Sequence, residues 1–222
     1  MFAVLFEVQP KPDQWETYLG YARALRPELE QIDGFVDNTR YASLSRPGWI
    51  LSLSSWRDEK ALVRWRTRAT HHEVQEKGRA GVLLDYHLRV GQITHDSRVP
   101  DGHALKEQRL DETEVGEGTT VGLIDGKCEP HWLKQQSPES LAHWLGSLPS
   151  AEGLMSWDVY DAVLAPGDVI LMSTWRDQEA AQQFEAVPAP PRAARRRRVR
   201  IVRDYAMFDR REAPQFYPDV AR

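Results

Sequence analysis

Apolar and polar positions divide the first part of the chain into short compact runs and longer periodic stretches. Residues 2–9 (FAVLFEVQ) are apolar and rich in β-forming residues, which predicts a buried strand. Between residues 13 and 32 the apolar positions recur at helical spacing, so this stretch predicts an amphipathic helix. Residues 35–45 and 50–56 then predict two strands joined by a turn that contains Pro and Gly.

A second helical region and a last strand complete this pattern. Asp58 is placed to cap a helix whose inward stripe begins at Leu62 and Trp65. A short further helix is expected from Thr70 to Lys77, and residues 81–95 contain the last apolar β-rich run. The predicted order β-α-β-β-α-β is that of a ferredoxin-like unit, so the fold class is α+β.

The hairpin of this unit occurs twice in the chain. Residues 34–58 and 153–177 align without a gap at an offset of 119 positions, which places Trp56 on Trp175. A repeat of this kind indicates a duplicated structural unit. A ferredoxin-like unit covers one face of its sheet with helices, so the other face needs a partner. We therefore expect two such units packed as an intramolecular dimeric α+β barrel.

The repeat also fixes the expected domain boundaries. The N-terminal unit spans residues 1–96, a polar linker spans 97–116, and a degenerate C-terminal unit spans 117–210. Residues 211–222 form a tail without a strong pattern. In the C-terminal unit, three prolines fall within 187–198, so no long second helix is expected there.

Composition narrows the classes of partner. The formal net charge is −4, which does not favour a nucleic-acid or membrane-binding polycation, and no membrane-spanning apolar run is present. A single cysteine excludes an internal disulfide framework, and no metal-ligand spacing occurs, so we expect no metal. The basic run Arg195–Arg198 is interpreted as a solvated loop neutralised by acidic neighbours such as residues 111–117. We expect a soluble cytoplasmic protein.

The segment SLSSWRDEKALVRWRTRATHHEVQEKGR, followed by DYHLRV, resembles the antibiotic biosynthesis monooxygenase family of the dimeric α+β barrel superfamily. The resemblance is clearest over residues 2–95. Its most specific positions are Trp65-Arg66, His71, Gln75, Gly78-Arg79 and Asp85-Tyr86. It implies a pocket between each sheet and its helices, and an oxidoreductase of the monooxygenase type. Family members oxidise polyketide aromatics without a cofactor, degrade heme, or have no assigned activity.

Four residues of the N-terminal unit are candidates for the site. His71 and His72 are the catalytic candidates, because a histidine with a pKa near neutrality can accept a proton from an acidic phenol or enol. Trp65 and Gln75 are the ligand-binding candidates. A regular helix would turn only one of the two histidines into a pocket, and a break near Thr70 would exchange them. The alternative is a solvent-facing histidine pair at a helix end.

The C-terminal unit has lost this polar set. At the offset of 119, the positions of Trp65, His71, His72 and Gln75 are occupied by Phe184, Pro190, Pro191 and Ala194. The pocket is therefore expected in the N-terminal unit.

The leading functional hypothesis is a cofactor-independent monooxygenase acting on a small hydrophobic or aromatic molecule. The alternatives are a non-catalytic small-ligand binding protein and a heme-binding or heme-degrading protein. Heme-degrading relatives carry an Asn on the first strand, where this chain has Phe6 and Glu7, and a His where it has Gln75. We therefore expect no cofactor, with heme as the minority alternative. The expected partner is a small hydrophobic molecule, without nucleic acid or membrane. The internal pseudo-dimer leaves further self-association open.

Overall fold

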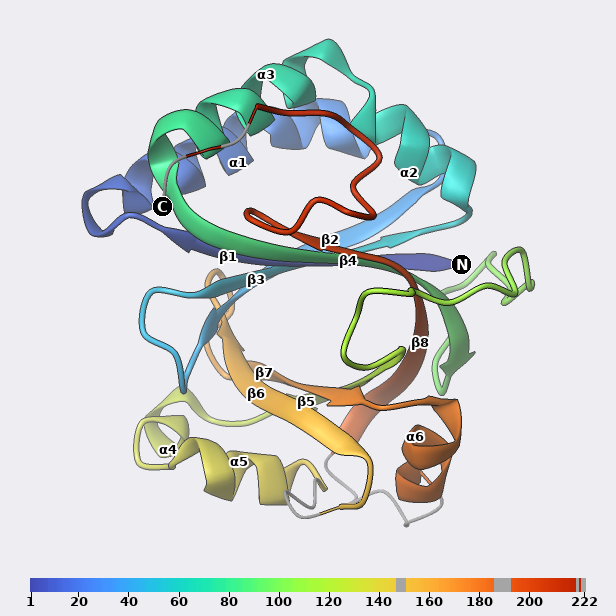
Figure 1. Ribbon diagram of the computed structural model, residues 1–222. Helices are drawn as coiled ribbons and strands as arrows, with labels where there is room; N and C mark the ends of the chain where they lie inside the picture. The colour runs from blue at the N-terminus through green and yellow to red at the C-terminus, as the bar shows by residue number, and fades with distance from the viewer. Residues whose placement is uncertain (147–150, 186–192, 219, 221–222) are drawn as a thin grey trace.

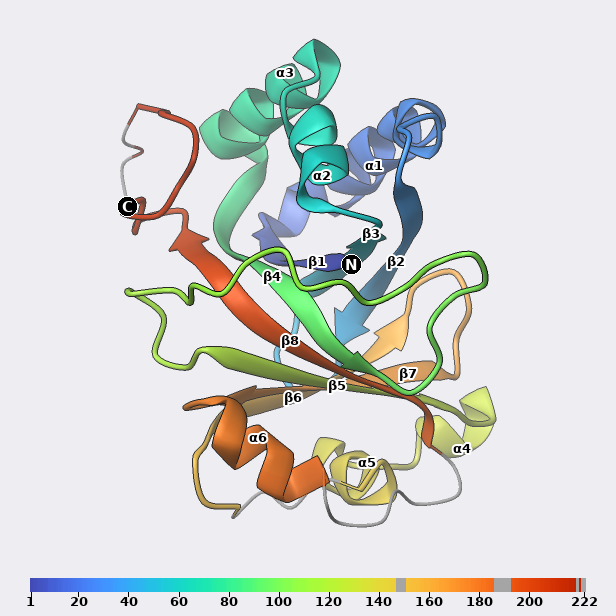
Figure 2. The same cartoon turned by 90° about the vertical axis from the view of Figure 1, so that its right-hand side faces the viewer.

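Eight antiparallel strands form one closed barrel with helices on two opposite sides (Figure 1). The computed structural model describes residues 1–146, 151–185, 193–218 and 220. The strands follow one another around the barrel in the order β1-β3-β2-β6-β7-β5-β8-β4. Figure 2 shows α1, α2 and α3 on one side of the barrel and α4, α5 and α6 on the other. In the described part of the chain, no helix is long and apolar enough to cross a membrane.

The first unit follows the expected order, and its helical region is more broken than the sequence pattern predicts. Its elements are β1 (Phe2–Pro10), the 3₁₀ helix η1 (Pro12–Gln14), α1 (Trp15–Glu30), β2 (Phe35–Ser43), β3 (Ile50–Trp56), α2 (Glu59–Arg66), α3 (Ala69–Lys77), the π-helix η2 (Gly78–Val82) and β4 (Leu83–Asp96). Helix α3 ends at Lys77, as expected, and the π-helix η2, which the sequence analysis did not predict, follows before the strand begins.

The second unit arranges its strands as the first does. Its elements are β5 (Thr120–Lys127), α4 (Pro130–Leu133), α5 (Pro138–Trp144), β6 (Leu154–Ala162), β7 (Asp168–Trp175), α6 (Gln178–Glu185) and β8 (Ala193–Ala206). Within the barrel the order β4-β1-β3-β2 in the first unit matches β8-β5-β7-β6 in the second. The short helix α4 carried no signal that the sequence analysis used.

Residues 119 positions apart make the same contacts in the two units. The indole Nε1 of Trp56 donates to Ser54 Oγ at 2.9 Å, and that of Trp175 donates to Ser173 Oγ at 2.9 Å. Both indoles are about 1% exposed and therefore belong to the core. The helix caps agree as well: Asp58 accepts from the Ala61 amide and Asp177 from the Ala180 amide, each at 2.8 Å.

The helical region of the second unit is short. Helix α6 ends at Glu185 and strand β8 begins at Ala193, so no continuous helix runs from 180 to 196, as the prolines predicted. Those prolines, in residues 186–192, lie outside the described residues.

The stretch between the units packs against the barrel. The amides of Gln108 and Arg109 donate to the side-chain oxygen of Gln92 at 2.7 and 2.9 Å, and Thr113 N donates to Ile201 O at 2.8 Å. Residues 97–116 contain no helix.

The interpretation of Arg195–Arg198 as a solvated loop is wrong, because these residues belong to β8. Arg195 pairs with Asp96 at 2.6 Å, and Arg197, which is 4% exposed, pairs with Asp125 at 2.9 Å. Strand pairing brings Asp96 and Asp125 next to these arginines from the neighbouring strands β4 and β5. Neither carboxylate belongs to residues 111–117, where the neutralising groups were expected.

The interior of the barrel is filled by side chains from both units. Its apolar cluster contains Leu5, Leu53, Leu123, Met172 and Ile201, among others. Glu7 also lies inside the barrel and is 4% exposed. Because neighbouring strand residues face opposite ways, the residues that alternate with these face the helices of each unit.

Candidate functional site

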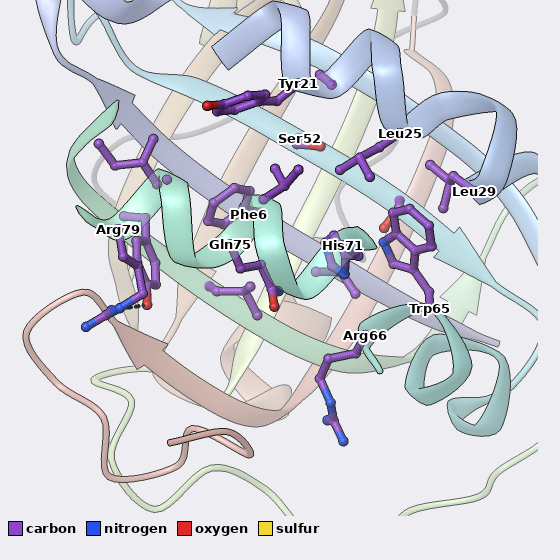
Figure 3. Close-up of a pocket in the computed structure, with 18 of the residues that line it drawn as sticks. Phe6, Tyr21, Leu25, Leu29, Ser52, Trp65, Arg66, His71, Gln75 and Arg79 are labelled. Carbon is purple, nitrogen blue, oxygen red and sulfur yellow. Dashed lines mark hydrogen bonds between the residues drawn. The ribbon is translucent and has the colours of Figure 1, made fainter. Parts of the chain in front are cut away.

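A cavity of about 210 Å³ lies between the sheet of the first unit and helices α1 to α3 (Figure 3). Its floor is made by the outward-facing residues of the strands, including Val4, Phe6, Leu88 and Val90. Its walls include Leu25, Leu29, Leu62, Trp65 and Val74 from the helices. An engineered apolar cavity of about 150 Å³ already binds benzene, so this space is large enough for a small organic molecule.

In the second unit, described side chains pack into the corresponding space. A hollow on its sheet measures only about 10 Å³. At Gly126, an added Cβ would overlap the side chain of Leu145 and lie 2.9 Å from Trp144, so α5 packs directly on β5. The larger cavity is therefore in the first unit, where the sequence analysis expected the pocket.

A break between α2 and α3 places His71 beside Trp65. Helix α2 ends at Arg66, and Arg68 has an extended backbone (φ −63°, ψ 131°) before α3 begins. The imidazole of His71 stacks on the Trp65 indole with ring centroids 4.4 Å apart and planes 22° apart. Both residues line the cavity and lie together at one end of it in Figure 3.

The environment of His71 keeps its ring neutral near pH 7. Burial lowers the pKa of His71 to about 4, although the backbone carbonyls of Trp65 and Arg66 act in the opposite direction. Its Nδ1 atom is buried and has no hydrogen-bond partner among the described residues. The sequence argument assumed a pKa near neutrality, and that assumption is wrong for this ring. An imidazole of such low basicity is poorly suited to remove a weakly acidic proton.

Gln75 lines the cavity, whereas His72 is not among the lining residues. The His72 ring stacks on Tyr217 with centroids 5.3 Å apart, and its Nδ1 lies 3.0 Å from the Tyr217 hydroxyl. The same hydroxyl donates to Gln75 Oε1 at 2.7 Å. The suggestion of His72 as a catalytic base therefore loses its geometric support, because the break before α3 gives the cavity-facing position to His71.

Sequence reasoning missed a basic group at the other end of the cavity. Arg79 is 6% exposed, and its Nη1 donates to the Tyr86 hydroxyl at 2.6 Å. Arg210 Nη1 donates to the same hydroxyl at 2.6 Å. Tyr86 has a copy, Tyr205, at the offset of 119. Both line this one cavity, because β8 pairs with β4 along the edge of the first unit.

The tail also contributes to the cavity. Gln215 and Tyr217 line it, and Gln215 Nε2 donates to Arg66 O at 3.4 Å. Figure 1 shows the chain after β8 rising from the sheet toward α3. The sequence offered no periodic pattern here, so this contribution becomes apparent only in three dimensions.

The charge of the cavity lining is one-sided. Arg40, Arg66, Arg79 and Arg210 line it, and among the described residues no Asp or Glu does. Within the described part of the chain, none of these four guanidinium groups forms an ion pair with a carboxylate. The Nε atoms of Arg40, Arg66 and Arg210 are buried without a hydrogen-bond partner there. An apolar cavity with unneutralised arginines favours an anionic ligand with a hydrocarbon body.

Comparison with known proteins supports an oxygenase relationship. The model of the antibiotic biosynthesis monooxygenase family matches residues 1–77. A curated protein of Pyricularia oryzae, named jasmonate monooxygenase ABM, is 50% identical over 226 residues, covering 100% of both chains.

One solved structure agrees with this chain at the level of the fold. The crystal structure of an aldoxime dehydratase has a TM-score of 0.52 at 13% identity, over 90% of this chain and 81% of that one. A crystal structure of an antibiotic biosynthesis monooxygenase matches 45% of this chain and 100% of its own, at 18% identity and a TM-score of 0.37. The half-identical relative spans the whole chain, and the family model matches the unit that contains the cavity, so this chain belongs to the antibiotic biosynthesis monooxygenase family.

Proposed function

We propose that the protein is a monooxygenase acting on jasmonate or a closely similar small carboxylic acid, bound in the cavity of the first unit. The observation that carries this proposal is the lining of that cavity, whose described residues are mostly apolar and include four arginines but no Asp or Glu. Such a lining favours a ligand that combines a hydrocarbon body with a negative charge.

Jasmonate has this chemistry, since it joins a cyclopentanone ring and a hydrocarbon chain to a carboxylate. The proposal takes the substrate from the Pyricularia oryzae relative, whose name specifies jasmonate and whose identity of 50% extends over both whole chains. The apolar residues would enclose the ring and chain, with Trp65 supplying the largest contact surface. The His71 ring, stacked on Trp65, would contact the substrate at the same end of the cavity.

The reaction is proposed to be independent of a cofactor: no cofactor would share the cavity with the substrate. Sites for drug-sized ligands and cofactors typically measure about 300–1,000 Å³, so a cavity of about 210 Å³ suits one small molecule. In a monooxygenation, one oxygen atom of O₂ enters the product and the other leaves as water. Converting a CH₂ group to a ketone supplies all the electrons for this from the substrate, whereas forming an alcohol requires two electrons from an external donor.

The decisive experiment is incubation of the purified protein with jasmonate under isotopically labelled dioxygen, followed by mass spectrometry. Parallel reactions contain and lack a reduced flavin and nicotinamide donor. We expect a product that carries one labelled oxygen atom and is absent from heat-denatured samples. Absence of this product in every reaction, with jasmonate binding intact, would favour the non-catalytic binding protein instead. The dependence on the donor would identify the electron source.

We further infer that the chain is a tandem duplication in which only the first unit keeps the cavity. The equivalent indole and helix-cap contacts at the offset of 119 support this. Because the described strands form a closed barrel, they leave no open sheet edge for a second chain. Light scattering should therefore give the mass of one chain, and a dimer mass would contradict this inference.

A further inference from the structure

Two guanidinium groups converge on one hydroxyl at the end of the cavity opposite Trp65 and His71. Arg79 and Arg210 each donate an Nη1 hydrogen to the Tyr86 hydroxyl at 2.6 Å. We propose that Arg79 and Arg210 form a carboxylate-binding subsite, and that the C-terminal tail, residues 208–218, closes over the bound ligand. This proposal rests on the proposed function for the identity of the substrate, but not for the existence of the subsite.

The charge balance around the two arginines supports an anion. The remaining bonds of Arg79 go to the carbonyl oxygens of Met207 and Pro218, at 3.4 and 3.3 Å, and are therefore long. Arg210 Nη2 donates to the Gln215 carbonyl at 3.0 Å, and its buried Nε has no partner among the described residues. Neutral acceptors satisfy hydrogen bonds without compensating the charge. Two like charges sharing one phenol oxygen repel each other, and a carboxylate between them would remove that repulsion.

Aromatic rings contact the guanidinium groups of both arginines in the subsite. The Arg79 guanidinium carbon lies 5.4 Å from the centre of the Tyr217 ring, and that of Arg210 lies 5.5 Å from it. Arg210 also lies 5.2 Å from the Tyr205 ring centre. Contact with ring faces holds a cation without consuming its hydrogen-bond donors. The donors of both groups can therefore reorient toward an incoming carboxylate.

The subsite defines how an elongated ligand lies in the cavity. Figure 3 shows Arg79 at one end of the cavity and Trp65 with His71 at the other, with Gln75 between them. His71 and Arg79 are eight positions apart along a nearly continuous helical segment, which corresponds to about 12 Å at the α-helical rise. A carboxylate on Arg79 therefore directs the apolar part of the ligand along α3 toward Trp65.

The tail supplies a part of this subsite and covers it. Arg210 and Gln215 belong to it, and Tyr217, which is 7% exposed, is anchored on α3 through Gln75 and His72. The neighbouring Phe216 is 90% exposed. Tyr217 lines the cavity and is held against α3, so opening of this anchor would widen the path for ligand exchange.

The charge preference is tested by binding under anaerobic conditions, where no turnover occurs. Isothermal titration calorimetry compares two acids, jasmonate and octanoate, with their neutral methyl esters. The wild-type protein should prefer the acids. Arg79→Gln and Arg210→Gln should each weaken acid binding by about tenfold or more and leave ester binding unchanged. Arg23→Gln, the same change in an exposed arginine that does not line the cavity, should keep the preference.

The outcomes separate this proposal from the proposed function. Lack of an acid preference in the wild type, or an unchanged preference in Arg210→Gln, overturns the subsite. If Arg79→Gln does not fold, Arg210→Gln decides alone. Acid preference without any oxygenation of jasmonate supports the subsite and refutes the proposed function.

The closing role of the tail is tested by stopped-flow fluorescence with octanoate. Tyr217→Ala removes the anchor and should raise the dissociation rate by about tenfold, the loss expected for one good hydrogen bond with its ring packing. Phe216→Ala changes the exposed neighbour and should keep the wild-type rate. Equal dissociation rates in Tyr217→Ala and the wild type would overturn the closing role.

Discussion

Replacing His71 by Phe should remove a pH-dependent loss of stability. In the folded protein, burial lowers the pKa of His71 from its ordinary value of 6.5 to about 4. Between these two pH values the unfolded chain binds a proton that the folded chain does not, so acid favours unfolding. The contribution is absent above pH 6.5, grows as the pH falls below it, and is complete below about pH 4.

The expected size follows from the difference between the two pKa values. One pKa unit corresponds to about 1.4 kcal/mol, so the complete effect is about 3 kcal/mol. Between pH 7 and pH 5, linkage gives a loss of about 2 kcal/mol in the free energy of unfolding. With a urea m-value of about 2 kcal/mol/M, this lowers the unfolding midpoint by about 1 M. Phe keeps an aromatic ring against Trp65 and has no titrating group.

Urea unfolding at pH 7 and pH 5 compares the wild type, His71→Phe and the control His72→Phe. The control variant changes the adjacent histidine, which does not line the cavity, and keeps His71. The unfolding midpoint of the control should therefore fall between pH 7 and pH 5 by about as much as that of the wild type. The His71→Phe midpoint should shift by about 1 M less than that of the other two proteins. Equal shifts in all three proteins would refute the conclusion that His71 is neutral because it is buried.

Three further predictions concern the cavity and the barrel. Trp65→Ala should destabilise the protein by about 3–5 kcal/mol in urea unfolding and weaken jasmonate binding in calorimetry, because the indole is 9% exposed and forms a wall of the cavity. Glu7→Gln should cost about 3–5 kcal/mol by the same assay, because Glu7 accepts from Arg89 at 2.8 Å and from Arg46 at 2.6 Å inside the barrel; stability equal to wild type would contradict that pairing. Titration with hemin should produce no shifted Soret band, since the cavity of about 210 Å³ is smaller than typical cofactor sites, and a saturable shifted band that is lost in His71→Phe would restore the heme alternative.

Local sequence signals were sufficient for most of the strands and helices. The strand β1 and the hairpin that follows α1 have clear apolar patterns and turn residues, and the repeat placed their counterparts in the second unit. The run Arg195–Arg198 near the start of β8 was interpreted as a loop, because a run of arginines has the composition of a solvated segment. What makes that run a strand is the set of carboxylates on neighbouring strands, such as Asp96 and Asp125, which sequence order does not bring together.

Only those residues of the candidate site that the family resemblance marked were predictable from the sequence. Trp65 and Gln75 were identified from the family resemblance, and both line the cavity. The choice between His71 and His72 depended on a backbone break at Arg68, and no single-residue propensity fixes the rotation that such a break produces. Arg210 is a charged residue in the sequence, but the direction of its side chain depends on how the tail folds back over the cavity.

The cavity of the first unit cannot be assembled from the first unit alone. Tyr205 lies on β8, and Arg210, Gln215 and Tyr217 follow it, yet all four line a space between the first sheet and its own helices. A separate copy of residues 1–96 would therefore lack one side of the cavity and one arginine of the proposed carboxylate subsite. In a dimer of two identical chains, each cavity would need its own tail. In this chain of two units, one tail serves one cavity. The second unit therefore packs Leu145 and Trp144 against its own sheet, and it is still needed for the cavity of the first unit because it supplies Tyr205 and leads into the tail.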